Sequence, residues 1–320
     1  MAELLEKVLC SSADGSPQPL RYWIPSKAMR HGAILIALHT WSFDYQADLS
    51  SWFAEAQRRG WMYLQPNFRG PNWAPQACGS QAAMRDIIDA LDWVLADTPR
   101  RPERIYLAGA SGGGHMALQA VAHFPERFTA VSVWCGITDL ALWHQMHSRD
   151  GLGVGYGEHI EKVVGGPPGA SPEVNRELWL RSPIHHLHQA WKVPLDINHG
   201  IHDGHRGAVP LHHSVQAFNV IARAWQVPPV SEDEQRELWS QHRLSHPRPS
   251  DVAGDPSYER SIYLRRYAGS SRLTIFDGGH EWNAVTACHW LAQQAAPGLI
   301  SDPAALPVET AGGATSTIAR

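Results

Sequence analysis

The chain has 320 residues, of which 43% are hydrophobic and 18% charged, and its formal net charge is -4. This composition is ordinary for a globular protein, and the length suffices for one large α/β domain. This small negative net charge does not favour binding to nucleic acid or to an acidic membrane, which both attract positively charged proteins. No apolar run is long enough to span a bilayer. We therefore expect neither of these partners, and the oligomeric state stays open.

Four cysteines are scattered over positions 10, 78, 135 and 288, with no C-x-x-C spacing. They form neither a zinc motif nor a dense disulfide framework, so free thiols in a reducing compartment are expected. The first residues lack the basic and apolar segments of a secretory signal. We expect a cytoplasmic protein, or a secreted or periplasmic one if a signal peptide has been removed.

The first third of the chain predicts the start of a layered α/β fold. Strands at 6–11 and 20–24 are separated by turn residues and read as a hairpin. Residues 33–39 are almost continuously apolar, which is typical of a strand buried on both faces in a parallel sheet. A helix at 47–59 and a strand at 61–65 follow.

Strands and helices continue to alternate along the rest of the chain. Residues 81–97 predict an amphipathic helix, because apolar side chains recur at three- and four-residue steps. This alternation predicts an α/β fold with a doubly wound, mostly parallel sheet and helices on both faces. The further predicted strands are 105–108, 129–135, 194–198 and 273–276.

Two long segments interrupt this rhythm, within what we expect to be a single domain over residues 1–300. Residues 137–192 are rich in Trp, His, Gly and Pro, and we expect them to form a cap over the active site. Residues 226–262 contain a short charged helix and are expected to be peripheral. Residues 301–320 read as a mobile tail.

A candidate nucleophile lies where the central strand meets its helix. Residues 109–113 read Gly-Ala-Ser-Gly-Gly, the pattern G-x-S-x-G, with an apolar strand before it and an apolar-periodic helix after it. The flanking glycines permit a sharp turn that presents the Ser111 hydroxyl. The alternative is an ordinary glycine-rich turn.

A serine nucleophile needs a base, and the base needs an acid that orients it. In this chain order the acid follows the serine and the histidine comes last, each at the end of a strand. Asp203 is the predicted acid, and Asp139 is its rival after the preceding strand. His280, after the final strand and two glycines, is the predicted base.

The oxyanion of an acyl-transfer intermediate requires hydrogen-bond donors. We expect one donor to be the backbone N–H of Gly112, next to the nucleophile. The second is expected from the loop after the first buried strand, at Trp41 or at the neighbouring Thr40.

These motifs resemble the α/β-hydrolases, and more narrowly the catalytic domain of the prolyl-oligopeptidase branch. The resemblance implies an α/β-hydrolase fold and serine catalysis without a cofactor or metal. It gives Arg69 two readings, an anchor for a substrate carbonyl or carboxylate and a structural ion pair. Thr40 and Trp41 stand where the family often has glycines. The likeness rests on residues 38–39, 66–70, 109–113, 181–184, 199–203 and 278–280.

The chemistry so predicted is that of a serine carboxylic-ester hydrolase. Stand-alone domains of this type resemble esterases that remove acyl groups from polysaccharides, so an acylated carbohydrate or similar small ester is the expected substrate. Tryptophans that could stack on sugar rings support this expectation, with Trp282 assigned to substrate binding. The other tryptophans of this kind are Trp41, Trp73 and Trp143.

Two other functions stay open at this stage. One is a peptidase for short peptides, although the chain shows no propeller sequence and no Glu-Glu motif for a free N-terminus. The other is a non-catalytic binding module, against which the full set of triad residues argues. A cluster at His185, His186 and His188 looks metal-like, but no carboxylate or cysteine stands at ligand spacing.

Overall fold

A nine-stranded sheet forms the centre of the computed structural model, which describes residues 3–26, 32–98 and 102–294. Its six central strands are parallel, while the hairpin at one edge and the last strand at the other are antiparallel. From edge to edge the strands are β1 (Leu5–Cys10), β2 (Pro17–Trp23), β4 (Met62–Pro66), β3 (Ala33–Leu38), β5 (Arg104–Ala110), β6 (Ala130–Trp134), β9 (Leu195–Gly200), β11 (Ser271–Phe276) and β10 (Ile262–Ala268).

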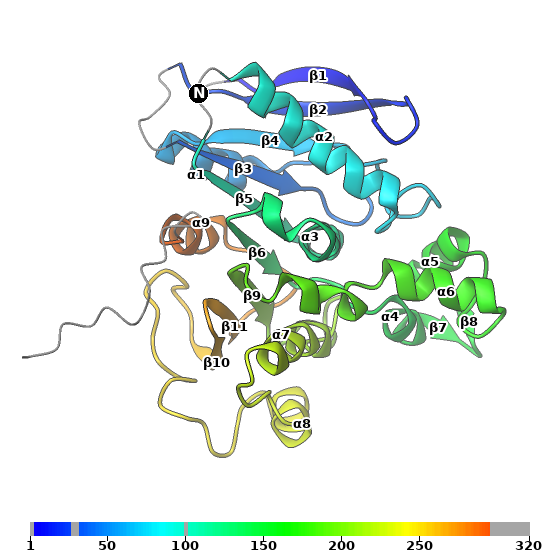
Figure 1. The fold of residues 1–320 in the computed structure, drawn as a ribbon. Coiled ribbons are helices and arrows are strands. Elements are labelled where there is room, and N and C mark those ends of the chain that lie inside the picture. Colours follow the sequence, from blue (N-terminus) through cyan, green and yellow to red (C-terminus); the bar gives the residue numbers. More distant parts are fainter. Residues whose placement is uncertain (1–2, 27–31, 99–101, 295–320) are drawn as a thin grey trace, which may run out of the picture.

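Helices cover both faces of this sheet (Figure 1). Helices α1 (Ser50–Arg59) and α9 (Ala284–Ala292) pack together on one face. Helices α2 (Gln81–Asp97), α3 (Gly112–His123) and α7 (His212–Ala224) cover the other. The doubly wound α/β-hydrolase fold expected from the sequence is therefore confirmed.

Strand β3 shows why an unbroken apolar run marks the middle of the sheet. Successive side chains of a strand point to opposite faces. Ile34 and Ile36 accordingly join the core under α2, α3 and α7, whereas Leu35 joins the core under α1 and α9. All six residues of β3 are buried, so both faces had to be apolar.

Strand β10 is absent from the sequence-based expectation. Its Arg265 and Arg266 are both buried, so charged residues interrupt the apolar pattern by which a buried strand is recognised in the sequence. The burial is possible because Arg265 pairs with Asp255 at 2.8 Å and Arg266 with Asp251 at 2.5 Å.

The helices of the segment 137–192 project beyond the carboxyl edge of the sheet (Figure 1, right), and their apolar side chains form a core together with Trp41, Cys78 and Val209 from outside the segment. We call this segment the cap, after the position over the active site that the sequence analysis predicts for it. Its elements are α4 (Leu140–Met146), β7 (Ser148–Arg149), β8 (Leu152–Gly153), α5 (Tyr156–Val164), α6 (Pro172–Arg181) and the 3-10 turns η2 (Pro183–His185) and η3 (Leu187–Ala190).

The second insertion, 226–262, contacts the loop that follows β9. Its helix α8 (Glu232–Gln241) brings Trp239 into a stack on His205, with ring centroids 3.7 Å apart, on the loop that follows β9. The expected tail at 301–320 lies outside the described residues. Within the described ranges, no helix is long and apolar enough to cross a membrane.

Candidate active site

A pocket of about 340 Å³ opens at the carboxyl edge of the parallel strands. Its walls come from the segments that follow four strands: the loop after β3, Ser111 after β5, Cys135 after β6 and His280 after β11. Tyr156 of the cap closes one side. This is the edge at which open α/β sheets bind ligands. Four predicted site residues line this one pocket: Trp41, Ser111, His280 and Trp282.

Ser111 occupies a strained turn between β5 and α3. Its φ is 55° and its ψ -121°, a left-handed conformation that is costly for a residue with a Cβ atom. Gly109 makes the turn possible, since a Cβ there would lie 2.3 Å from the carbonyl oxygen of Gly113. The turn holds the serine at the pocket, as the G-x-S-x-G pattern predicts.

Asp203 and His280 form a hydrogen-bonded pair beside that serine. Nδ1 of His280 lies 2.6 Å from Oδ2 of Asp203, which is fully buried. A carboxylate can only accept here, so the imidazole donates from Nδ1 and presents Nε2 as the proton acceptor. This is the tautomer that a general base for Ser111 requires.

The surroundings of Asp203 keep it ionised. Burial alone would raise the pKa of this carboxyl, but the His280 hydrogen bond, the nearby His199 and the Val209 N–H hold the pKa below its ordinary value. Its other oxygen, Oδ1, accepts from the backbone N–H groups of Gly204 and Val209 at 2.9 and 3.2 Å. Asp203 is thus fixed in place as well as charged.

The rival acid is occupied elsewhere. Asp139 caps the N-terminus of α4, where its carboxylate accepts from the Leu142 N–H at 3.0 Å. Asp203 therefore contacts His280, whereas Asp139 serves as the N-cap of α4.

The backbones of Trp41 and Gly112 approach each other closely. A Cβ on Gly112 would lie 2.5 Å from both the nitrogen and the Cα of Trp41. In the described ranges, neither N–H donates to another protein group. Gly112 is the first residue of α3, where backbone N–H groups are free and favour negative charge. The close approach favours Trp41 over Thr40 as the second oxyanion donor.

Cys135, His199 and Asp203 place their ligand atoms within 4.8 Å of one another, all buried. A metal does not fit there, because both ring nitrogens of His199 are engaged. Nε2 donates to the Val209 carbonyl at 3.0 Å, so Nδ1 can only accept, from the Ser214 hydroxyl at 2.8 Å. Burial raises the pKa of the Cys135 thiol well above its usual value, which keeps it protonated and a poor ligand.

The tryptophans do not share one role. Trp282 lines the pocket, and its indole N–H donates to the Ser51 hydroxyl at 3.1 Å. Trp41 also reaches the pocket but is 2% exposed, and it packs edge-on against the fully buried Trp143 of the cap. Trp143 is therefore unavailable for stacking on a sugar. Trp73 packs against His159 of α5, with ring centroids 5.0 Å apart, and it is not among the residues that line the pocket.

The histidine cluster near the end of the cap is a packing feature. His185 stacks on Trp179, with ring centroids 5.6 Å apart, and His186 meets the same ring edge-on. Nε2 of His186 lies 3.2 Å from the Trp179 carbonyl oxygen. The Trp179 indole thus contacts His185 and His186, two of the three histidines of this cluster.

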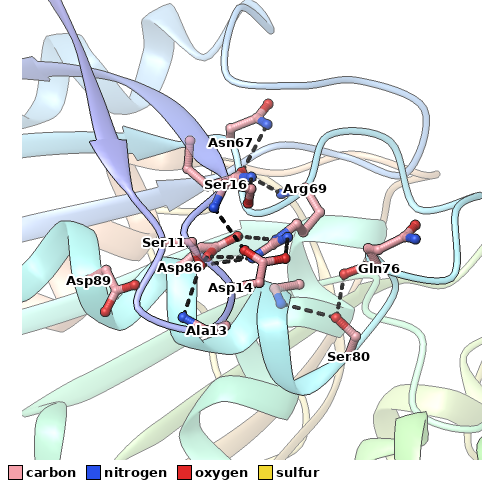
Figure 2. A network of polar contacts seen from close by, with 12 residues as sticks. Ser11, Ala13, Asp14, Ser16, Asn67, Arg69, Gln76, Ser80, Asp86 and Asp89 are labelled. Atoms are coloured by element: carbon pink, nitrogen blue, oxygen red, sulfur yellow. Dashed lines mark hydrogen bonds and ion pairs between the residues drawn. The ribbon is translucent and has the colours of Figure 1, made fainter.

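Arg69 does not lie at the pocket, so its assignment to substrate binding is wrong. Figure 2 shows its guanidinium directed at acidic side chains and Ser11 instead. Nε donates to Asp86 at 2.6 Å, Nη1 to Asp14 at 2.7 Å and Nη2 to Ser11 at 2.8 Å. Every guanidinium nitrogen is used, and the side chain is 7% exposed. The structural alternative, an ion pair that ties loops together, describes this residue.

Sequence reasoning missed several pocket residues. Cys135 is the last residue of the predicted strand 129–135, so the rule that strand ends converge on one edge was signal enough to find it. Phe43 and Asp48 also line the pocket but lie on a long loop. Tyr156 comes from the cap. No local pattern marks these three positions.

Comparison with known proteins places this geometry in a family. The model of the prolyl oligopeptidase family matches residues 41–228, more than half of the chain. No curated protein matches the chain. A puromycin-hydrolyzing peptidase from Mycobacterium tuberculosis superposes with a TM-score of 0.57 and 17% identity, over 90% of this chain and 37% of that one. The acylaminoacyl peptidase of Pyrococcus horikoshii superposes with a TM-score of 0.53 and 18% identity, over 69% of this chain and 35% of that one.

At these identities the structural likenesses show the fold alone, and the chain spans little more than a third of the length of these two relatives. The family match is the stronger finding. It includes Ser111 on its turn and Asp203, the partner of His280. The chain belongs to the prolyl oligopeptidase family of serine hydrolases.

Proposed function

We propose that this protein is a serine hydrolase that cleaves amide bonds in short peptides. The observation that carries the proposal is the 2.6 Å contact between His280 and Asp203 at the pocket that Ser111 lines. Membership in the prolyl oligopeptidase family favours peptides over carbohydrate esters, and both solved relatives described above are named peptidases.

In this mechanism, Oγ of Ser111 attacks the carbonyl carbon of the scissile amide while Nε2 of His280 takes the hydroxyl proton. The N–H groups of Trp41 and Gly112 hold the oxyanion that forms. His280 then gives its proton to the leaving amine, and an acyl-enzyme remains. Water activated by the same imidazole releases the acyl group. Asp203 holds the imidazole tautomer and stabilises its protonated form throughout.

A carbohydrate ester is the second candidate substrate. The aromatic side chains of Phe43, Tyr156 and Trp282 on the pocket walls favour it, because sugar rings and acyl groups both pack well on aromatic surfaces. The same serine chemistry would serve an ester, so the substrate, rather than the mechanism, separates the two candidates.

Hydrolysis of an aminoacyl 4-nitroanilide and of a 4-nitrophenyl acetyl ester by wild type and Ser111→Ala tests this proposal. We expect cleavage of both by the wild type and loss of both in the variant, since activated esters are also attacked by serine peptidases. Ester cleavage with the anilide and unblocked short peptides untouched would contradict the peptidase and support the esterase. Labelling of wild type, but not Ser111→Ala, by a fluorophosphonate reports the nucleophile independently.

A further inference from the structure

A second pocket, of about 360 Å³, lies directly beside the first. The two share Glu281 and Trp282 as a common wall, immediately after His280 in the chain. The far side of the second pocket is formed by α1 and by the start of α9. Both pockets are at the small end of the range for ligand sites, about 300–1,000 Å³. A substrate larger than the first pocket would reach the second only past Glu281 and Trp282, the residues that both pockets share.

The chemistry fixes which end of a substrate would lie there. His280 must reach the leaving nitrogen to protonate it, so the leaving group departs on the histidine side of the scissile bond. The oxyanion is held on the other side, by Trp41 and Gly112. The wall shared by the two pockets consists of Glu281 and Trp282, the residues that follow His280, which favours the leaving-group side for the second pocket.

Arg260, from the second insertion, is a cationic side chain on the wall of this pocket, which also carries the acidic Glu55 and Glu281. In the described part of the chain its hydrogen bonds both leave from Nη1, to Glu281 at 2.6 Å and to the Asp277 carbonyl at 3.3 Å. Nε and Nη2 therefore stay available for another acceptor. The side chain is 45% exposed, so it can meet a ligand. A carboxylate is the acceptor that matches two neighbouring guanidinium N–H groups.

We propose that the second pocket is a leaving-group subsite in which Arg260 binds the C-terminal carboxylate of a short peptide. This rests on the proposed function and narrows it to peptides that end close behind the scissile bond. The subsite also gives the second insertion a role, since it supplies both Arg260 and the aromatic wall residue Tyr258.

The test compares two peptides that share one N-blocked residue at the scissile bond followed by Gly-Gly, one with a free C-terminal carboxylate and one as the carboxamide. In the wild type we expect kcat/KM to favour the carboxylate by roughly tenfold, the size of one charge-assisted hydrogen bond. In Arg260→Gln we expect the ratio to fall to about one, and in Arg260→Lys to an intermediate value. Arg176→Gln, an exposed arginine on α6, is the matched control and should keep the wild-type ratio.

The ratio of kcat/KM between the carboxylate and carboxamide peptides distinguishes binding of the carboxylate by Arg260 from a purely structural role of Arg260. If Arg260 only supported Glu281 beside His280, its loss would slow both peptides equally and leave the ratio unchanged, which would overturn the proposal. A wild-type ratio near one would overturn it as well. Ala54→Trp narrows the second pocket from α1, and we expect it to lower peptide cleavage relative to nitrophenyl-ester cleavage about tenfold, while Ala54→Ser does not.

Binding of the same two peptides to Ser111→Ala, measured by calorimetry, gives the comparison without turnover. If no peptide is cleaved by the wild type, the proposed peptidase function fails. The subsite is then judged from Kd alone: tighter binding of the carboxylate that is lost on adding Arg260→Gln supports it, and equal or undetectable binding of both peptides refutes it.

Discussion

Replacement of Arg69 by Met tests whether this residue is structural. The substitution keeps much of the side-chain volume and removes the charge that Asp86, Asp14 and Ser11 share (Figure 2). The side chain of Asp86 is 1% exposed, so the variant leaves a buried carboxylate with only the Ser11 hydroxyl, at 2.5 Å. Breaking a buried pair in this way costs about 3–5 kcal/mol. We expect about 3 kcal/mol, because Asp86 can take up a proton and the half-exposed Asp14 contributes little.

The loss of folding stability in Arg69→Met should depend on pH in a defined direction. Burial raises the pKa of Asp86 above its ordinary value even with Arg69 present, since desolvation outweighs the hydrogen bonds from Arg69 and Ser11. Without Arg69 that pKa rises further. A carboxyl whose folded pKa exceeds its unfolded value binds its proton more tightly when folded, so it favours folding as pH falls through the folded pKa. The destabilisation should be full at pH 8 and smaller at pH 5.

Urea unfolding followed by tryptophan fluorescence measures this loss, with kcat/KM for a nitrophenyl ester measured on the same preparations. We expect the free energy of unfolding to fall and kcat/KM to stay within about twofold of wild type, because the guanidinium lies away from the pocket. Arg176→Met is the surface control. A drop of about a hundredfold in kcat/KM with unchanged stability would refute the structural role of Arg69 and support its role in substrate binding.

Three further predictions concern the site and its surroundings. Asp203→Asn should lower kcat by about 10³–10⁴ with little change in urea midpoint, because the amide favours the wrong imidazole tautomer; a loss under tenfold would remove Asp203 from the triad. Gly112→Ala should abolish turnover or folding, since its Cβ would lie 2.5 Å from the Trp41 backbone, whereas Gly254→Ala, with open space at its Cβ, should match wild type in both assays. Thiol titration at pH 7.5 should find only the exposed Cys10 in the native protein and four thiols after unfolding; rapid native reaction of more than one would contradict it. Burial raises the pKa of Cys78 and Cys288 to about 12. It raises the pKa of Cys135 well above its usual value.

The sequence by itself determined the features that depend on neighbours along the chain. Helix α2 begins and ends at the residues that its apolar periodicity predicts, since amphipathic spacing is a local signal. The nucleophile turn is equally local, because a serine at φ 55° needs glycines at fixed distances. The order of strands then predicts that Ser111, Asp203 and His280 lie at one edge of the sheet.

Only the tertiary structure decided the features in which charge is paired across the chain. From the sequence, an arginine is equally compatible with solvent, substrate or a buried carboxylate. Arg69 meets Asp86 and Asp14, from α2 and from the turn between β1 and β2. Strand β10 was hidden for the same reason, since its buried arginines are neutralised by residues of a preceding loop.

The pockets also became visible only in three dimensions. Asp203 and Asp139 both follow strands and both suit an acid, and the direction of their side chains separates them. Tyr156 and Arg260 reach the two pockets from insertions that have no counterpart in the alternating pattern. Periodicity reports which face of an element is buried. It does not report which distant element covers that face, because that depends on packing between segments far apart in the chain.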